Sequence, residues 1–187
     1  MQELIDDMFT EEKINGKIYL MARPNKNHMR VQYNVCSVFN NYFRNRNKNC
    51  EAVFETQFDV DDDNYIVPDV MVFCYDSNKD IPLIVIEVLS KSTRDRDFTI
   101  KMKKYAEIGV KEYWLIDYQS HSIDIYVLSD SVYKPFKSYT FYRQEDFVII
   151  KNRKAREKEQ AEAIKEFSPC SIPEITIKIE DIFYFVD

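Results

Sequence analysis

Residues 83–89 form an almost continuous apolar stretch that contains one acidic side chain. The stretch reads Leu-Ile-Val-Ile-Glu-Val-Leu, and Glu87 is its only polar residue. A strand that is apolar on both faces is usually buried on both faces. A lone carboxylate in such a strand loses its hydration, which costs several kcal/mol unless a partner compensates it. The pattern therefore predicts a buried strand over 83–90 and a partner for Glu87.

Apolar residues at helical spacing predict two helices. The first begins at about His28, with Asn27 as its N-cap, and ends near the polar run 44–49. The second spans 95–108 and ends at Gly109, a residue type that suits a helix C-terminus. These helices flank a region whose pattern is mostly extended.

Alternating and β-rich patterns predict strands through the rest of the chain. A short hairpin is expected around 16–23, before a turn at Pro24, and the last strand lies in 174–186, ahead of a short apolar segment. Residues 152–166 are highly charged and predict an exposed helix or a mobile excursion. The other predicted strands are 51–60, 65–75 (with Pro68 inside it, at an edge, a bulge or a strand start), 83–90, 112–118, 122–128, 133–142 and 145–151.

The order of these elements predicts an α/β or α+β fold with a central mixed sheet flanked by helices. The strand, helix and strand within 83–115 fit one right-handed crossover. A length of 187 residues favours a single domain over 1–187, with the charged excursion at about 151–166. No apolar run approaches the roughly 20 residues of a membrane helix, and the acidic N-terminus lacks the apolar core of a signal peptide. We therefore expect a cytoplasmic protein without membrane contact.

The four cysteines, at positions 36, 50, 74 and 170, form no C-x-x-C pair. This spacing argues against a zinc site or a disulfide framework, and we expect reduced, mostly buried thiols.

The charged residues are unevenly distributed, although the net charge is −6. No acidic residue lies between Glu12 and Glu51, an interval with many lysines and arginines, and a second basic cluster spans 91–104. Such blocks can form a phosphate-binding face on an acidic protein. An unevenly charged solvated surface explains the charges alone equally well.

Asp69 and Glu87 lie in consecutive predicted strands, joined by a turn at 76–80. A hairpin would bring both carboxylates to one end of the sheet, where they would suit Mg²⁺ or Mn²⁺. Lys101 shares one face of the following helix with Asp97 and Tyr105, because the three are spaced four residues apart. Two acids, a lysine and a metal can hydrolyse a phosphodiester.

Each residue of this set also has a structural explanation. Asp69, after Pro68, could cap a turn, Glu87 could pair structurally with a basic residue, and Lys101 could be a solvated helix lysine. His28 could line the site or simply begin a helix, and His121 has no assigned role. We favour the functional interpretation because the pieces occur together and in this order.

The segments "VPDVMVF", "VIEVLSKSTRDRD", "KYAEIGVKEYWLID" and "IDIYVL" resemble the Uma-type restriction endonucleases, a branch of the PD-(D/E)XK nuclease superfamily. The resemblance extends over 27–128 and recurs weakly near the C-terminus. It implies a restriction-endonuclease-like core, and it implies that Asp69 and Glu87 match the metal-binding acids of the family. The backbone carbonyl of Val88 would be a third metal ligand.

The resemblance departs from the parent motif at one position. The superfamily usually has its lysine two residues after the glutamate, where this chain has Leu89. In this branch the lysine has moved into the following helix, and Lys101 matches it. His28 matches a histidine at the start of the first family helix.

These observations predict a Mg²⁺- or Mn²⁺-dependent endonuclease acting on DNA, with Asp69, Glu87 and Lys101 as catalytic residues. His28, Arg94 and Arg96 are the predicted substrate-binding residues, and a homodimer would suit double-strand cutting. Two alternatives stay open. One is a non-catalytic nucleic-acid-binding or assembly module on the same fold. The other is a structural interaction protein that docks through its C-terminal "IFYFV".

Overall fold

The computed structural model describes residues 9–75, 81–148 and 152–187, and its main body is a mixed six-stranded sheet with strand order β10-β9-β8-β7-β6-β3. A four-stranded sheet has the order β2-β1-β5-β4, and β11 pairs with β12. The strands are β1 (Phe9–Ile14), β2 (Lys17–Ala22), β3 (Cys50–Phe54), β4 (Phe58–Asp61), β5 (Asn64–Ile66), β6 (Val70–Cys74), β7 (Ile84–Val88), β8 (Glu112–Asp117), β9 (Ser122–Ser129), β10 (Val132–Thr140), β11 (Glu166–Phe167) and β12 (Ile177–Lys178).

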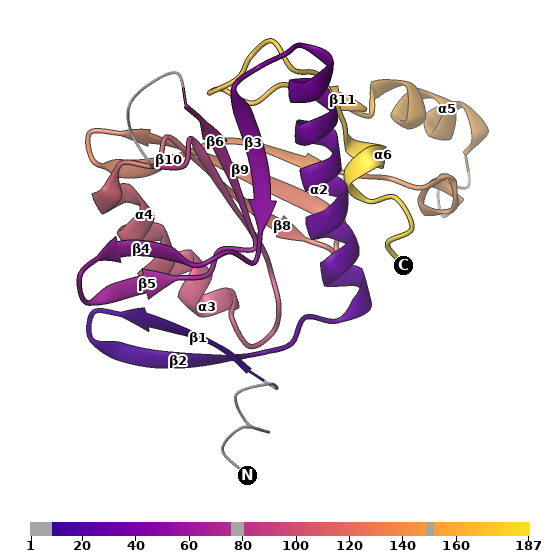
Figure 1. The fold of residues 1–187 in the computed structure, drawn as a ribbon. Coiled ribbons are helices and arrows are strands. Elements are labelled where there is room, and N and C mark those ends of the chain that lie inside the picture. Colours follow the sequence, from indigo (N-terminus) through magenta and orange to yellow (C-terminus); the bar gives the residue numbers. More distant parts are fainter. Residues whose placement is uncertain (1–8, 76–80, 149–151) are drawn as a thin grey trace.

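Helices cover the six-stranded sheet on both faces (Figure 1). Among the described strands, only β7 and β8 pair in parallel, and the helical segment between them makes the predicted strand–helix–strand connection. The predicted mixed sheet flanked by helices is confirmed. The helices are α2 (Lys26–Asn45), α3 (Arg94–Arg96), the π-helical turn η1 (Asp97–Lys101), α4 (Met102–Ile108), the 3-10 turn η2 (Gln144–Phe147), α5 (Arg153–Glu162) and α6 (Ile179–Ile182).

The long helix α2 packs its apolar stripe on the sheet. Val31, Val35, Phe39 and Phe43 recur at helical spacing, and all four are buried. The N-cap is Asn25, whose side chain accepts hydrogen bonds from the backbone N–H groups of the second and third helical residues. The predicted cap at position 27 is therefore two residues too late, because an earlier asparagine satisfies the same donors.

The helix after β7 is continuous but contains a π-helical turn. Arg94 begins α3, η1 follows, and α4 ends at Gly109, whose φ of 88° suits a residue without a Cβ. The π-helical turn carries Asp97 and Lys101, which are both buried. Such turns often occur at functional sites.

Two predicted strands are each divided in the structure. The predicted strand 51–60 breaks at Glu55, which has a φ of 45°, so that β3 and β4 join different sheets. Pro68 separates β5 from β6 because it has no backbone N–H to donate to a neighbouring strand. The strand predicted over 145–151 is wrong for 145–147, which belong to the 3-10 turn η2. Residues 149–151 lie outside the described residues.

The charged segment near the C-terminal end contains α5. Asn152 caps it by accepting hydrogen bonds from two backbone N–H groups, and most of its side chains are exposed. Figure 1 shows α5 beside the sheet body, beyond α6. Within the described ranges, no helix is both long and apolar enough to cross a membrane.

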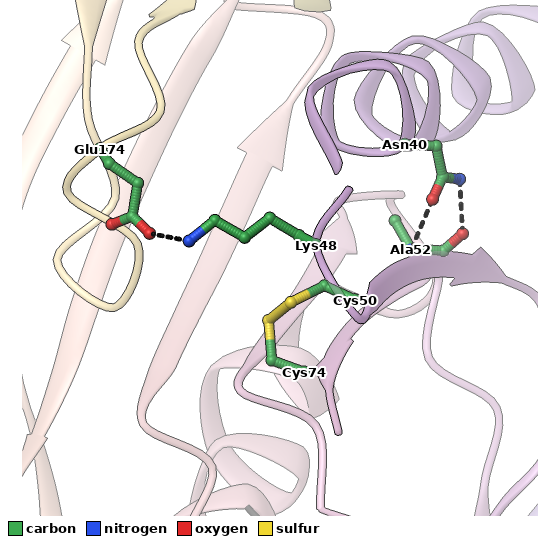
Figure 2. Close-up of a disulfide and its surroundings, with 6 residues drawn as sticks. All are labelled: Asn40, Lys48, Cys50, Ala52, Cys74 and Glu174. Carbon is green, nitrogen blue, oxygen red and sulfur yellow. Dashed lines mark hydrogen bonds and ion pairs between the residues drawn. A yellow bond between two sulfur atoms is a disulfide. The ribbon is translucent and has the colours of Figure 1, made fainter. Parts of the chain in front are cut away.

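The expectation of four reduced cysteines is wrong for two of them. Cys50 and Cys74 form a disulfide between β3 and β6 (Figure 2). Cys36 is buried and free, and Cys170 is exposed and free. The pairing follows from strand register, which places Cys50 opposite Cys74 with their Cα atoms 4.1 Å apart. Sequence spacing alone does not reveal that register.

The disulfide should stabilise the edge of the sheet measurably. It joins positions 24 residues apart, and in the chain-entropy account a closed loop of that length contributes about 3 kcal/mol. We expect the Cys50→Ser/Cys74→Ser variant to lose about that much free energy of unfolding in urea titration. The matched control is Cys170→Ser, which should change it by no more than about 0.5 kcal/mol. Equal unfolding midpoints for the double variant and the wild type would contradict the expectation.

Candidate active site

A cavity of about 210 Å³ opens where the N-terminal hairpin, α2, β7 and η1 meet. Four of the predicted site residues line it: His28, Asp69, Glu87 and Lys101. They come from the start of α2, the segment before β6, strand β7 and the π-helical turn. Residues far apart in the sequence therefore meet in one place.

Strand pairing explains why the two predicted metal-binding acids meet. β6 and β7 pair antiparallel, with Val70 opposite Ile86. The residues before and after that pair, Asp69 and Glu87, therefore lie at the same end of the two strands. The predicted turn at 76–80 lies outside the described residues, but the pairing of the strands does not depend on it.

Asp69 is held by three hydrogen bonds. Its Oδ2 accepts from the backbone N–H of Val88 at 2.6 Å and contacts His28 Nε2 at 3.0 Å. Its Oδ1 accepts from Gln32 Nε2 at 2.9 Å, and the same amide donates to Glu55 Oε1 at 3.1 Å. Residues on α2 and β7 thus fix the orientation of this carboxylate.

Glu87 faces the ammonium of Lys101, which is the partner that its place in an apolar strand predicts. Its Oε1 accepts from Lys101 Nζ at 2.9 Å and from the Tyr105 hydroxyl at 2.6 Å. Lys101 Nζ also lies 2.8 Å from Oε1 of Glu12 on β1 and 3.9 Å from Oδ1 of Asp97. The lysine is 1% exposed, so these ion pairs are screened little by water.

The cluster carries more acid than base. Glu12, Glu87 and Asp97 are buried and Asp69 is largely buried, and all four surround the single ammonium of Lys101. Burial, together with the negative charge of Glu87, raises the pKa of Asp97 to about 7 and that of Asp69 well above its ordinary value. Burial also raises the pKa of Glu12, although Lys101 opposes the shift.

Lys101 and His28 respond to burial in different ways. Burial alone would lower the pKa of Lys101, but the four carboxylates around it raise that pKa overall. The lysine therefore stays charged and donates hydrogen bonds at neutral pH. Burial lowers the pKa of His28 to about 4, so His28 is a neutral imidazole that can donate from Nε2 to Asp69.

The two predicted arginines do not line the cavity. Arg94 is half exposed and donates to Asp117 Oδ2 at 2.8 Å. Arg96 is mostly buried, and its Nε lies 3.7 Å from Glu12 Oε2. Val88 reaches the site through its N–H group, which binds Asp69. The predicted ligand role of its carbonyl stays a prediction.

Sequence reasoning gave no site role to Glu12, Gln32 or Glu55. In the structure, Glu12 alternates with Ile14 on the buried face of β1 while Glu11 is exposed. The sequence hides this position, because Glu12 stands in an acidic stretch that is typical of a solvated surface. Gln32, on the buried side of α2, gives only a weak signal, since it is a polar residue beside the apolar stripe.

Comparisons with known proteins agree with this fold. The chain is 31% identical over 129 residues to the "Uncharacterized protein slr1290" of Synechocystis sp., which covers 64% of this chain and 66% of that protein. It also resembles a crystal structure described as "a putative nuclease belonging to DUF820" from Anabaena variabilis, with a TM-score of 0.67 and 20% identity over 95% of this chain and 92% of that one. The family model Uma2, described as "Putative restriction endonuclease", matches residues 3–165. The chain therefore belongs to the Uma2 family.

Proposed function

We propose that this protein is a metal-dependent endonuclease that hydrolyses phosphodiester bonds in DNA. The observation that carries the proposal is the convergence of Asp69, Glu87 and Lys101 on one cavity from three separate segments. The description of the Uma2 family as restriction endonucleases supports a nuclease activity, and paired carboxylates beside a lysine suit phosphodiester hydrolysis.

The donor set of the cavity fits Mg²⁺ or Mn²⁺. Both cations prefer oxygen ligands, and Asp69 and Glu87 offer carboxylates beside a third buried acid, Asp97, whose Oδ1 has no hydrogen-bond partner in the described part of the chain. Over the same residues, no three acidic, histidine or cysteine side chains form a ready-made metal cage. Mg²⁺ usually binds to one or two carboxylates together with substrate phosphates, so a two-carboxylate site is sufficient.

Asp69, Glu87 and the Val88 carbonyl would hold the cation. When bound, it would supply Lewis-acid polarisation of the phosphate and lower the pKa of a water. It would also offset the negative charge that, together with burial as the larger cause, raises the pKa values of Asp69 and Asp97.

The residues of the chain do the positioning. His28 and Gln32 fix the Asp69 carboxylate, and Tyr105 fixes that of Glu87. Lys101 cannot serve as a base at neutral pH because its pKa is raised, so it orients the attacking water as a hydrogen-bond donor and stabilises negative charge on the phosphate.

DNA contacts outside the cavity would involve the exposed basic residues. Arg94 is the better placed of the two predicted arginines, because exchanging its exposed ion pair with Asp117 for a phosphate costs little. Arg96 is turned toward Glu12 and serves the cluster instead. Cytoplasmic location and a homodimer stay predictions.

The test is a nicking assay on supercoiled plasmid. We expect the purified protein to nick DNA with Mg²⁺ or Mn²⁺, and we expect EDTA or the Asp69→Asn substitution to abolish nicking, since either removes the cation. The cation should also raise the melting temperature of the wild type, because it binds only the folded state; an excess of about 100 times its Kd corresponds to about 2.7 kcal/mol.

Two outcomes would contradict the proposal. Cleavage that persists in EDTA would exclude a metal-dependent mechanism. Salt-dependent DNA binding without nicking, and without any cation-induced rise in melting temperature, would favour the non-catalytic nucleic-acid-binding module.

A further inference from the structure

Glu12 joins the N-terminal hairpin to the candidate catalytic lysine. It lies on β1, is 0% exposed, and places Oε1 2.8 Å from Lys101 Nζ. The same oxygen accepts a hydrogen bond from the backbone N–H of Val67 at 3.1 Å. Its other oxygen lies 3.7 Å from Arg96 Nε and has no hydrogen-bond partner among the described residues. Glu12 therefore links β1 to the segment between β5 and β6 and to the helix after β7.

A buried carboxylate at this position is costly for the fold. Neighbouring positions on the same face of the hairpin sheet are apolar, as Ile14 and Ile66 show, and both are fully buried. Burial raises the pKa of Glu12, which means that the ionised form is disfavoured by its surroundings. A well-packed apolar residue would fill such a site at no electrostatic cost. The carboxylate therefore calls for an explanation beyond packing.

The geometry at Lys101 supplies that explanation. An ammonium has three N–H donors. Glu87 Oε1 accepts a hydrogen bond from one of them at 2.9 Å, and Glu12 Oε1 forms an ion pair with the same Nζ at 2.8 Å, while Asp97 lies 3.9 Å away. Because Lys101 lines the cavity, an N–H that Glu87 does not use can be directed into it.

We infer that Glu12 is a positioning residue for Lys101: its carboxylate and that of Glu87 hold the ammonium between them, and an N–H that Glu87 does not use is thereby aimed at the water or phosphate oxygen in the cavity. The inference rests on the proposed nuclease function for the role of Lys101. It makes the N-terminal hairpin a part of the active site. Without Glu12, the long lysine side chain keeps one anchor and loses its fixed direction.

The test compares Glu12→Gln with Glu11→Gln. Both variants remove one negative charge from adjacent positions of β1, but Glu11 is exposed and accepts a hydrogen bond from the Tyr65 hydroxyl, away from Lys101. For Glu12→Gln we expect kcat for plasmid nicking to fall about 10- to 100-fold with KM within about threefold of wild type, since the lost effect is orientation. Glu11→Gln should keep both constants. A wild-type kcat for Glu12→Gln would overturn the inference.

A second measurement does not depend on cleavage. Nitrogen-15 NMR of lysine ammonium groups, with Lys101→Met to identify the signal, reports how firmly Nζ is held. We expect a sharp, slowly exchanging Lys101 signal in the wild type and in Glu11→Gln, and a broadened one in Glu12→Gln. An unchanged signal would overturn the positioning role. If the wild type cleaves no DNA, the proposed function fails while this measurement still decides the role of Glu12.

A folding defect would not end the test. If Glu12→Gln does not fold, Glu12→Asp keeps the charge but shortens the side chain by one methylene, which moves the anchor away from Lys101. Lower kcat and a broadened Lys101 signal in Glu12→Asp support positioning. Wild-type values for both would show that only the charge matters and would overturn it.

Discussion

Glu87→Gln should reduce metal-dependent nicking by about 1,000-fold or more and leave the fold intact. Glutamine keeps the shape of the side chain, and its amide oxygen can still accept hydrogen bonds from Lys101 and Tyr105. It removes one of the two carboxylates that would hold the cation. Nicking rates measured with saturating Mg²⁺ or Mn²⁺ test this expectation directly.

The same substitution should not destabilise the metal-free protein. The negative charge of Glu87 is one of the causes that raise the pKa values of Glu12, Asp69 and Asp97, so its removal relieves repulsion among buried acids. We expect an equal or higher melting temperature for Glu87→Gln in EDTA near pH 7.5. Retained nicking by this variant would refute the metal-binding role.

Glu112 provides a matched control on the neighbouring strand. It is also fully buried, but it accepts hydrogen bonds from Trp114 Nε1 and from the backbone N–H groups of Cys170 and Ser171, outside the cavity. An amide NH₂ at this position would face an N–H donor, so Glu112→Gln should lose about 1–3 kcal/mol of stability. Its nicking rate per folded molecule should equal that of the wild type. Glu87→Gln would then lose nicking without losing stability, and Glu112→Gln would lose stability without losing nicking.

The sequence pattern was sufficient for the parts of the site that depend on local periodicity. Glu87 was visible because an acid interrupts a strand that is otherwise apolar on both faces. Lys101 was visible because helical spacing placed it on one face with Asp97 and Tyr105, and the structure buries all three side chains. The mixed sheet followed from the order of strands and helices.

The features that were missed depend on contacts between distant residues. The disulfide between Cys50 and Cys74 requires the register of β3 with β6, which no local pattern encodes. Glu12 stands in an acidic stretch that is typical of a solvated surface, and its burial depends on Lys101, far away in the sequence. The backbone at Glu55 is left-handed and divides a predicted strand. Because this position holds a glutamate and not a glycine, the sequence gives no sign of that conformation.

Lys101→Met should destabilise the protein by about 3–5 kcal/mol at neutral pH, the usual effect of leaving buried charges without their partner. Methionine fills similar space, but Glu12 and Glu87 then lose the ammonium that lies 2.8 and 2.9 Å away. Urea unfolding at about pH 7.5 measures this loss. Lys103→Met, on the same helix but with a side chain that is 81% exposed, should change stability by no more than about 0.5 kcal/mol.

The destabilisation by Lys101→Met should shrink as the pH falls. Burial raises the pKa values of Asp97, Glu12 and Asp69, and Lys101 lowers them, so the folded variant takes up protons at a higher pH than the folded wild type does, while the same acids in the unfolded chain are still ionised. Proton uptake neutralises the charges that Lys101 no longer compensates. Unfolding free energies of wild type and variant should therefore converge toward about pH 5. A difference that is constant with pH would mean that lost packing, and not uncompensated charge, makes Lys101 necessary for the fold.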